Sequence, residues 1–332
     1  MTGVVVGIGT ADRCLAPSLR ETGAVMPLRE AWERALYGPA GFYTRQAPAD
    51  HFRTSSTASP LFAGAIADLA AACDVDTVID LAAGGGELAA GLDSIRPDLS
   101  LVAIDRRPRP DALPDRVEWR STLPERITGL VVANEWLDNV PCTVAEVDDD
   151  GRLREVLVDP PTGREALGDD VAPADLEWAR RWWPESEPVN RVEIGRARDE
   201  AWRDVVRRLD RGLALAIDYG HVAGARPEYG SLRAYLGGRA VDVAYDGSRD
   251  ITSDVALDAV AAAGGGRLLR QRETLRSLGL RRPRPDLELA REDPVGYVAA
   301  LSEAGAAAEL TASPGLGDFG WVVTAVGVPM PW

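Results

Sequence analysis

Four short apolar runs constrain the fold of this chain more than any other feature of its sequence. Each run is continuous, and each has an Asp or Asn at or next to its carboxyl end. Strands that are covered by helices on both faces show this pattern, because neither face meets water. The runs are residues 77–81, 101–105, 130–134 and 213–218. The sequence therefore predicts an α/β fold, a Rossmann-like parallel sheet with helices on both faces.

The segments around these runs divide the chain into three predicted parts. Residues 1–72 are predicted to form an amino-terminal helical extension with a lid-like loop. Residues 143–210 are rich in Asp, Glu, Arg, Pro and Trp, and we interpret them as an insertion for a substrate or partner. Residues 73–142 and 211–332 then make up the α/β core. Apolar spacing further predicts helices over residues 28–36, 61–72 and 255–263 and a terminal strand over residues 319–327.

The composition argues against several classes of function. The chain has 332 residues and a formal net charge of −15, which disfavours a nucleic-acid partner because phosphate binding needs a basic surface. Its 2 histidines and 3 widely spaced cysteines predict no metal site and no disulfide framework. No apolar stretch is long enough to cross a membrane, and the first residues lack a signal-peptide pattern. We therefore expect a cytoplasmic protein without membrane insertion.

A glycine-rich segment follows the first apolar run and predicts a small-molecule site. It begins at Asp80 and continues through Ala82, Gly84 and Gly86 into a helical pattern. Glycines let the backbone approach a ligand closely, and the start of the next helix presents free N–H groups. A second glycine pattern, at residues 4–9, has no apolar helix after it, so we interpret it as a surface strand.

Two acidic residues favour S-adenosylmethionine over a nicotinamide dinucleotide in this site. The spacing Gly84-x-Gly86-x-x-Ala89 fits either ligand. Asp80 suits the ammonium group of a methionine moiety but would repel a pyrophosphate. Asp105, at the end of the next run, can accept hydrogen bonds from two ribose hydroxyls in either cofactor. A nicotinamide-linked oxidoreductase therefore remains a less favoured alternative.

Polar residues at the ends of the later runs are the candidates for catalysis. Asn134, Glu135 and Asp138 follow the third run and would form a negatively charged wall beside the reactive methyl group. The two carboxylates could bind a guanidinium, and the amide could orient a nitrogen of the acceptor. Asp218 ends the fourth run and His221 follows it, so either could take a proton during transfer.

Ordered motifs over roughly residues 26–325 resemble the MidA family of S-adenosylmethionine-dependent methyltransferases. They include the glycine segment after Asp80 and the cluster from Asn134 to Pro141. Further matching motifs are Met26-Pro-Leu, Leu36-Tyr-Gly-Pro, Gly41-Phe-Tyr, Ile217-Asp-Tyr-Gly, Gly230-Ser-Leu-Arg-Ala-Tyr and Asp250-Ile-Thr. Mitochondrial members of this family are protein-arginine methyltransferases that help to assemble respiratory complex I. The resemblance implies a class I methyltransferase fold and transfer to a protein arginine, on a complex I subunit in those members.

The resemblance also implies roles for individual residues. Asp80, Gly84 and Gly86 would hold the methionine part of the cofactor and Asp105 its ribose, with contacts from Ala82, Asn134 and Thr54. Asn134, Glu135 and Asp138 would line the active site with Asp218 close by. Two departures affect these roles. Ala82 replaces the first glycine of the family motif, which a negative φ would tolerate. The family's Gly-Asp-Phe-x-Thr loop has His51 where the acid is expected.

The methyl acceptor and the oligomeric state stay open at this stage. A small-molecule methyltransferase of specialised metabolism would use the Trp-rich insertion as a closed pocket. A cofactor-binding assembly factor without turnover would use the insertion as an interaction surface. The expected partners are thus a protein that carries a reactive arginine or a small-molecule acceptor, and a homodimer is compatible with either.

Overall fold

A seven-stranded sheet forms the centre of the computed structural model, which describes residues 25–45, 55, 59–183 and 189–331. The strand order is β16-β17-β10-β5-β2-β3-β4. The five strands from β10 to β4 are parallel, and β17 runs antiparallel to both of its neighbours. The strands are β2 (Thr77–Leu81), β3 (Ser100–Ile104), β4 (Glu118–Arg120), β5 (Ile127–Asn134), β10 (Leu209–Asp218), β16 (Arg267–Arg270) and β17 (Gly320–Val326).

The strand order reverses between β2 and β5. From β2 the chain proceeds outward to β3 and β4, and it then returns to the other side of β2 to form β5 and β10. The carboxyl ends of β2 and β5 therefore flank a crevice. Ligands of open α/β sheets bind in such a crevice, at the point where the strand order reverses.

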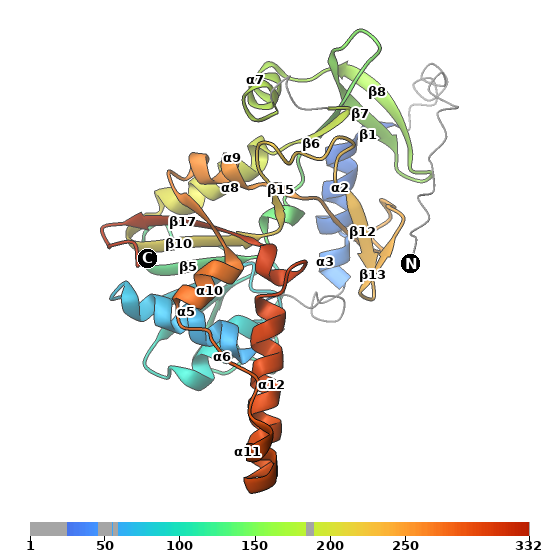
Figure 1. The fold of residues 1–332 in the computed structure, drawn as a ribbon. Coiled ribbons are helices and arrows are strands. Elements are labelled where there is room, and N and C mark those ends of the chain that lie inside the picture. Colours follow the sequence, from blue (N-terminus) through green and yellow to red (C-terminus); the bar gives the residue numbers. More distant parts are fainter. Residues whose placement is uncertain (1–24, 46–54, 56–58, 184–188, 332) are drawn as a thin grey trace.

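Helices cover both faces of this sheet, which explains why its central strands are continuously apolar (Figure 1). On β5, Leu130 and Val132 belong to a core with α5, α6 and α10, whereas Val131 and Ala133 face α8 and α9. The five helices are α5 (Pro60–Ala72), α6 (Glu87–Ile95), α8 (Arg196–Arg207), α9 (Leu257–Ala263) and α10 (Gln271–Ser277).

The predicted fold class is confirmed. All four predicted apolar strands are present, and the strand predicted over residues 77–81 has the bounds of β2. The terminal strand is also present, but it is antiparallel to β10. A continuously apolar pattern shows that a strand is buried on both faces, and it carries no information on strand direction.

A second, antiparallel sheet packs beside the first and includes most of the predicted insertion. Helix α2 (Leu28–Tyr37) covers it through Leu28, Trp32 and Leu36. The strands and the other helix are β1 (Met26–Pro27), β6 (Thr143–Val147), β7 (Leu153–Asp159), β8 (Arg164–Asp170), β9 (Arg191–Ile194) and α7 (Pro173–Trp182). Helix α8 lies within the same residue range, yet its Trp202 and Val205 pack on the seven-stranded sheet. The division into parts remains a prediction.

Small elements connect the two sheets at the carboxyl end of β5. Trp32 Nε1 donates a hydrogen bond to the carbonyl oxygen of Ile251 at 2.9 Å, so α2 is fixed to β14. These elements are α3 (Phe42–Arg45), the 3-10 turns η2 (Leu137–Asn139) and η3 (Leu316–Asp318), the sheet of β12 (Arg233–Leu236), β13 (Arg239–Val241) and β14 (Asp250–Thr252), and the pair β11 (Gly220–His221) and β15 (Val255–Ala256).

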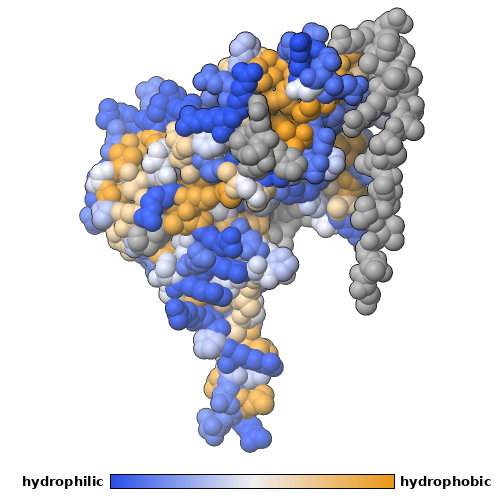
Figure 2. All heavy atoms as spheres, turned by 45° about the horizontal axis from the view of Figure 1, so that its top comes forward, coloured by the Kyte–Doolittle hydropathy of each residue, from blue (hydrophilic) through white to orange (hydrophobic). Residues whose placement is uncertain are grey.

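A helical hairpin of α11 (Leu287–Glu292) and α12 (Pro294–Leu310) projects from the body of the molecule (Figure 1). Figure 2 shows hydrophobic residues on this projection beside hydrophilic ones. Only the carboxyl-terminal part of α12 has buried residues, namely Ala304, Ala307 and Leu310. Within the described residues, no helix has both the length and the apolar character needed to cross a membrane.

Candidate functional site

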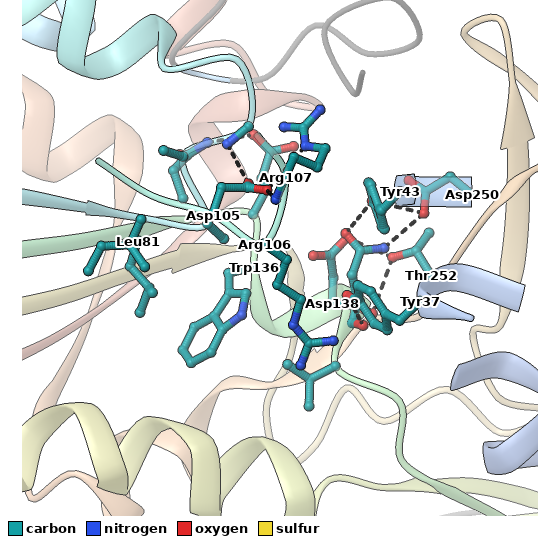
Figure 3. Close-up of a pocket in the computed structure, with 18 of the residues that line it drawn as sticks. Tyr37, Tyr43, Leu81, Asp105, Arg106, Arg107, Trp136, Asp138, Asp250 and Thr252 are labelled. Carbon is teal, nitrogen blue, oxygen red and sulfur yellow. Dashed lines mark hydrogen bonds and ion pairs between the residues drawn. The ribbon is translucent and has the colours of Figure 1, made fainter. Parts of the chain in front are cut away.

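A cavity of about 1030 Å³ opens at the carboxyl ends of β2, β3 and β5. Figure 3 shows Asp105 and Arg107 on one side of it and Tyr43, Asp138, Asp250 and Thr252 on the other. We call the first side the donor half and the second the acceptor half. The predicted site residues that line the cavity are Ala82, Gly84, Asp105, Asn134, Glu135 and Asp138. Asp80, Gly86 and Asp218 lie behind its wall.

The glycine turn of the donor half has a backbone that glycine makes possible. Gly84 has φ +62° and Gly86 has φ +81°, both in the left-handed region. A Cβ on Gly86 would lie 2.6 Å from Leu113 Cδ1, so the turn also needs the absence of a side chain there. Gly86 is the residue before α6, and the turn thus leads directly into the amino terminus of that helix.

Ala82 also lies in the left-handed region, with φ +58°. A negative φ was the condition under which alanine would be tolerated at this position. The structure does not meet that condition. A non-glycine residue in this conformation costs about 1–2 kcal/mol because its Cβ crowds the following carbonyl oxygen. Ala82 thus adopts a conformation that favours glycine, and the turn carries this local strain.

Asp105 connects β3 to the glycine turn. Its Oδ2 accepts a hydrogen bond from the Gly84 N–H at 3.0 Å, and its Oδ1 accepts from the Arg107 N–H and Nε at 2.9 and 3.1 Å. Oδ2 accepts only one hydrogen bond and has a second lone pair, so the group is oriented and can still accept from a ligand hydroxyl. Arg107 itself is a donor-half residue that the sequence did not indicate.

Asp80 has a buried carboxylate that is incompletely paired. The side chain is 5% exposed, and Oδ2 has no hydrogen-bond partner. Burial, and then the charge of Glu87, raise the pKa of Asp80 to about 7. A cation bound nearby would lower this pKa and stabilise the ionised form. Its assignment to the methionine ammonium stays a prediction, because Asp80 is not in the cavity wall.

Asn134 ends β5, Glu135 follows it, and both line the cavity between the two halves. Glu135 has φ +53°, and its Oε1 accepts hydrogen bonds from the Asn134 Nδ2 and the Ser55 N–H, each at 3.1 Å. Asn134 Oδ1 is buried without a partner. Burial, and next the charge of Asp138, raise the pKa of Glu135 to about 8. The pair therefore presents an oriented carboxylate and a free amide oxygen.

Asp138 has one carboxylate oxygen that is held and one that is free. Its Oδ2 accepts hydrogen bonds from the Thr252 hydroxyl at 2.7 Å and from the Tyr219 hydroxyl. Its Oδ1 is buried and has no partner. Burial raises the pKa of Asp138 more than these two hydrogen bonds lower it. A ligand that donates an N–H into the acceptor half would satisfy Oδ1.

Asp218 lies beneath Asp138 and positions it. Its Oδ2 accepts from the Leu137 and Asp138 N–H groups at 2.9 and 3.1 Å, and its Oδ1 accepts from the Tyr219 N–H. Asp218 is 1% exposed and does not line the cavity. Burial, together with the charge of Asp138, raises its pKa well above the ordinary range. These contacts favour a positioning role over the predicted direct role in catalysis.

Residues from distant segments complete the acceptor half (Figure 3). The Tyr43 hydroxyl lies 2.9 Å from Asn139 Oδ1 and 3.0 Å from Asp250 Oδ1. The ring of Tyr37 stacks on that of Tyr43, and the guanidinium of Arg106 lies 4.8 Å from the centre of the Tyr37 ring. Burial raises the pKa of Asp250 to about 7, with Asp138 as the second cause.

The acceptor half therefore concentrates carboxylates, although Arg198 and Arg233 lie near enough to Asp138 to lower its pKa. Asp138 and Asp250 are buried and Glu135 is half-buried, and desolvation is the main cause that raises the pKa of each. Within the part of the chain that the structure describes, none of these three groups forms an ion pair. Carboxylates in such surroundings favour the arrival of a cation, which restores the interactions that they lost on leaving water.

Three of the sequence predictions lie outside this cavity or outside the described residues. His221 is 7% exposed, its Nδ1 lies 2.8 Å from an Arg226 guanidinium nitrogen, and it does not line the cavity. Burial and Arg226 lower its pKa to about 3, so it is neutral at ordinary pH. Thr54 and His51 lie outside the described residues, as does the glycine pattern of residues 4–9.

Sequence reasoning did not assign Tyr37, Tyr43, Tyr219, Asp250 or Thr252 to the site. Each lies within a motif of the family resemblance, but the spacing of the motifs suggests no chemistry. The family resemblance was the only signal in the sequence that pointed to these residues, because the motifs that contain them are short and far apart in the chain.

A protein-family model described as "Putative S-adenosyl-L-methionine-dependent methyltransferase" matches residues 95–272. The chain belongs to this family. The match covers β3 to β16, and with it Asp105, the Asn134–Glu135 pair, Asp138 and Asp250. The methyltransferase class and S-adenosylmethionine as its cofactor are thus established at the level of the family.

Two solved structures are similar to this chain over most of its length. The first, from Burkholderia thailandensis, is bound to S-adenosyl-homocysteine; it is 26% identical, has a TM-score of 0.74, and the match covers 95% of this chain and 92% of that one. The second, a native crystal structure of a protein from the same organism, is 26% identical with a TM-score of 0.73, and the match covers 95% and 91%. No curated protein matches the chain.

Proposed function

We propose that this chain transfers the methyl group of S-adenosylmethionine to an arginine of a protein, as the MidA-like resemblance implies. The observation that carries the proposal is the free Oδ1 of Asp138, which lies beside Glu135 and Asp250 in a wall of carboxylates that form no ion pair within the described residues. A guanidinium supplies both the positive charge and the several N–H donors that this wall lacks.

The donor half fits S-adenosylmethionine. Asp105 would accept hydrogen bonds from the ribose, and the turn of Ala82, Gly84 and Gly86 would admit the methionine part. In support, the similar protein from Burkholderia thailandensis has S-adenosyl-homocysteine bound. When bound, the cofactor supplies a methyl group that its positively charged sulfur makes electrophilic.

The acceptor half would bind, orient and deprotonate the arginine. Asp138, held through Oδ2, would accept an N–H of the guanidinium at Oδ1, and Glu135 would accept another. In the transfer a bond forms between the guanidinium nitrogen and the methyl carbon while the bond from carbon to sulfur breaks. The nitrogen then loses a proton, and the ionised Glu135 carboxylate would take it. Orientation supplies much of the rate, because the reaction is an in-line displacement.

The proposal is tested by incubating the purified protein with radiolabelled S-adenosylmethionine and a fractionated lysate. We expect the label to enter protein and to appear as methylarginine after hydrolysis. Label in small molecules alone would contradict the arginine assignment and favour the alternative of a small-molecule methyltransferase. Binding of the donor without transfer to any fraction would favour an assembly factor without turnover. The Glu135→Gln variant serves as the matched control.

The physiological acceptor is proposed only by analogy with the mitochondrial members of the MidA family, which act on respiratory complex I. If the analogy holds, the labelled band should be a complex I subunit. Mass spectrometry of that band identifies the subunit and the modified arginine.

A further inference from the structure

The α11–α12 hairpin carries most of the exposed large hydrophobic residues of the described chain. Leu287 is 69% exposed, Val295 81%, Val298 65% and Leu301 36%. Only three other large hydrophobic side chains in the described ranges are exposed, namely Ile95, Tyr229 and Leu236. Contiguous exposed apolar surface of this kind is typical of an interaction site.

The exposed positions of α12 form one face of the helix. Apolar or small residues recur at Val298, Leu301, Gly305 and Ala308, with spacings of three and four. All four are exposed, whereas Ala304 and Ala307, toward the carboxyl end of the same helix, are buried. A helix that is apolar around most of its circumference is normally buried, so a partner is expected to cover this face.

A groove of about 580 Å³ lies at the base of the hairpin, where α12 meets the body. Small apolar side chains of α12 form its floor, and arginines form its rim. The lining residues are Arg276, Leu280, Arg281, Arg282, Pro283, Ala304, Ala307, Ala308 and Thr311. We call the end of the hairpin that carries Leu287, Val295 and Val298 its tip, so one surface holds both a hydrophobic tip and a groove.

The charges of the tip and the base are opposite. Glu288 and Glu292 on α11 are exposed, and neither forms an ion pair within the described residues. At the base, Arg276 and Arg281 are also exposed, and neither forms an ion pair within the described residues. Arg282 does form one, with its Nε 3.4 Å from Glu303 Oε2. This basic rim is unusual in a chain with a net charge of −15.

We infer that a second copy of this chain binds the α11–α12 hairpin, with the two α12 helices antiparallel about a twofold axis. In this arrangement the apolar tip of each copy enters the groove of the other, and the glutamates of each tip meet the arginines of the other base. A twofold interface must be self-complementary, because the same surface serves on both copies. The tip and the groove meet this condition in that both are apolar and their flanking charges are opposite.

The test is the mass of the full chain in solution, by sedimentation velocity over a range of concentrations. We expect a dimer for the wild type and at least a tenfold weaker association for Val298→Asp. Leu236→Asp, which places the same charge at an exposed apolar residue of β12, should remain dimeric. A monomeric wild type, or a Val298→Asp variant that dimerises as the wild type does, would overturn the inference.

Charge reversal distinguishes a second copy from any other partner. Arg281→Glu and Glu292→Arg should each weaken the dimer, because each places like charges across the interface. The variant that combines both substitutions should associate again. The charges of its tip and of its base are both reversed, so the tip of one copy still attracts the base of the other. A double variant weaker than both single variants would contradict the antiparallel arrangement. Binding of S-adenosyl-homocysteine by every variant confirms that the fold is intact, and this control does not depend on the identity of the acceptor.

Discussion

The two halves of the cavity are built in different ways. The donor half comes from one strand-turn-helix segment and the end of the next strand, and Asp105 joins these two parts through Gly84. The acceptor half gathers Tyr43, Asp138 and Asp250 from three segments that are far apart in the chain. Its carboxylates also form no ion pair within the described residues, and desolvation raises the pKa of each. The comparison suggests that the donor half is preformed for affinity, and that the acceptor half stays electrostatically incomplete until a cation arrives.

The largest expected effect separates chemistry from donor binding. Glu135→Gln should lower kcat by about 100-fold or more, because it removes a charge that acts as the reaction proceeds. The affinity for S-adenosyl-homocysteine should change little, since the amide keeps the shape of the side chain. Calorimetry and initial rates measure the two quantities. A parallel loss of both would mean that Glu135 belongs to the donor half.

The buried carboxylates predict how stability depends on pH. The folded pKa of Glu135 is raised to about 8, so its protonated form is favoured in the native state. The stability that this contributes is fully present below the unfolded pKa and is lost as the pH rises through 8. Glu135→Gln removes this dependence, and the variant should gain about 2 kcal/mol or more on the wild type between pH 5 and pH 8.5. Scanning calorimetry of both proteins at pH 5 and pH 8.5 tests this. A difference in stability between variant and wild type that is the same at both pH values would contradict the raised pKa.

Asp105→Asn should act on the donor half alone. The substitution removes a charged acceptor of hydrogen bonds, so the affinity for S-adenosyl-homocysteine should fall by about tenfold. At saturating donor, kcat should stay near that of the wild type. Asp98→Asn, a substitution of a surface carboxylate paired with Arg96, serves as the control and should change neither quantity. A large loss of kcat in Asp105→Asn would show that the two halves are not separable.

The smallest expected effect concerns the glycine turn. Ala82→Gly should stabilise the protein by about 0.5 kcal/mol, because the relief of left-handed strain exceeds the entropy cost of glycine. Ala83→Gly is the matched control; the φ of Ala83 is not positive, so this variant should lose about 1 kcal/mol. Thermal unfolding measures both. A destabilised Ala82→Gly would show that the alanine methyl has contacts that outweigh the strain.

The donor half could be predicted from the sequence because its information is local. Asp80, Gly84, Gly86 and Asp105 lie at strand ends or in the turn that follows, and the periodicity of the apolar runs locates those ends. The φ of Ala82 could not be predicted, because alanine is ordinarily found at negative φ. Its conformation follows from the path of the turn and not from the residue itself.

The acceptor half and the hairpin show where local information ends. Tyr43, Asp250 and Thr252 reach the site only because α2 and β14 pack together, as the hydrogen bond from Trp32 to Ile251 shows. Helix α12 was missed for a different reason. Its residues are apolar or small around most of the circumference, so no polar face marks a helical period. Arg281 and Arg282, in the loop before α11, line a groove that the sequence did not indicate.

The central claim is that the cavity has a donor half and an acceptor half. Its most direct test is a crystal structure of this protein from crystals soaked with S-adenosyl-homocysteine. We predict that the ribose will contact Asp105 and that the sulfur will face Glu135 and the free oxygen of Asp138. A ribose bound away from Asp105, or a sulfur directed away from these two carboxylates, would contradict the division into a donor half and an acceptor half.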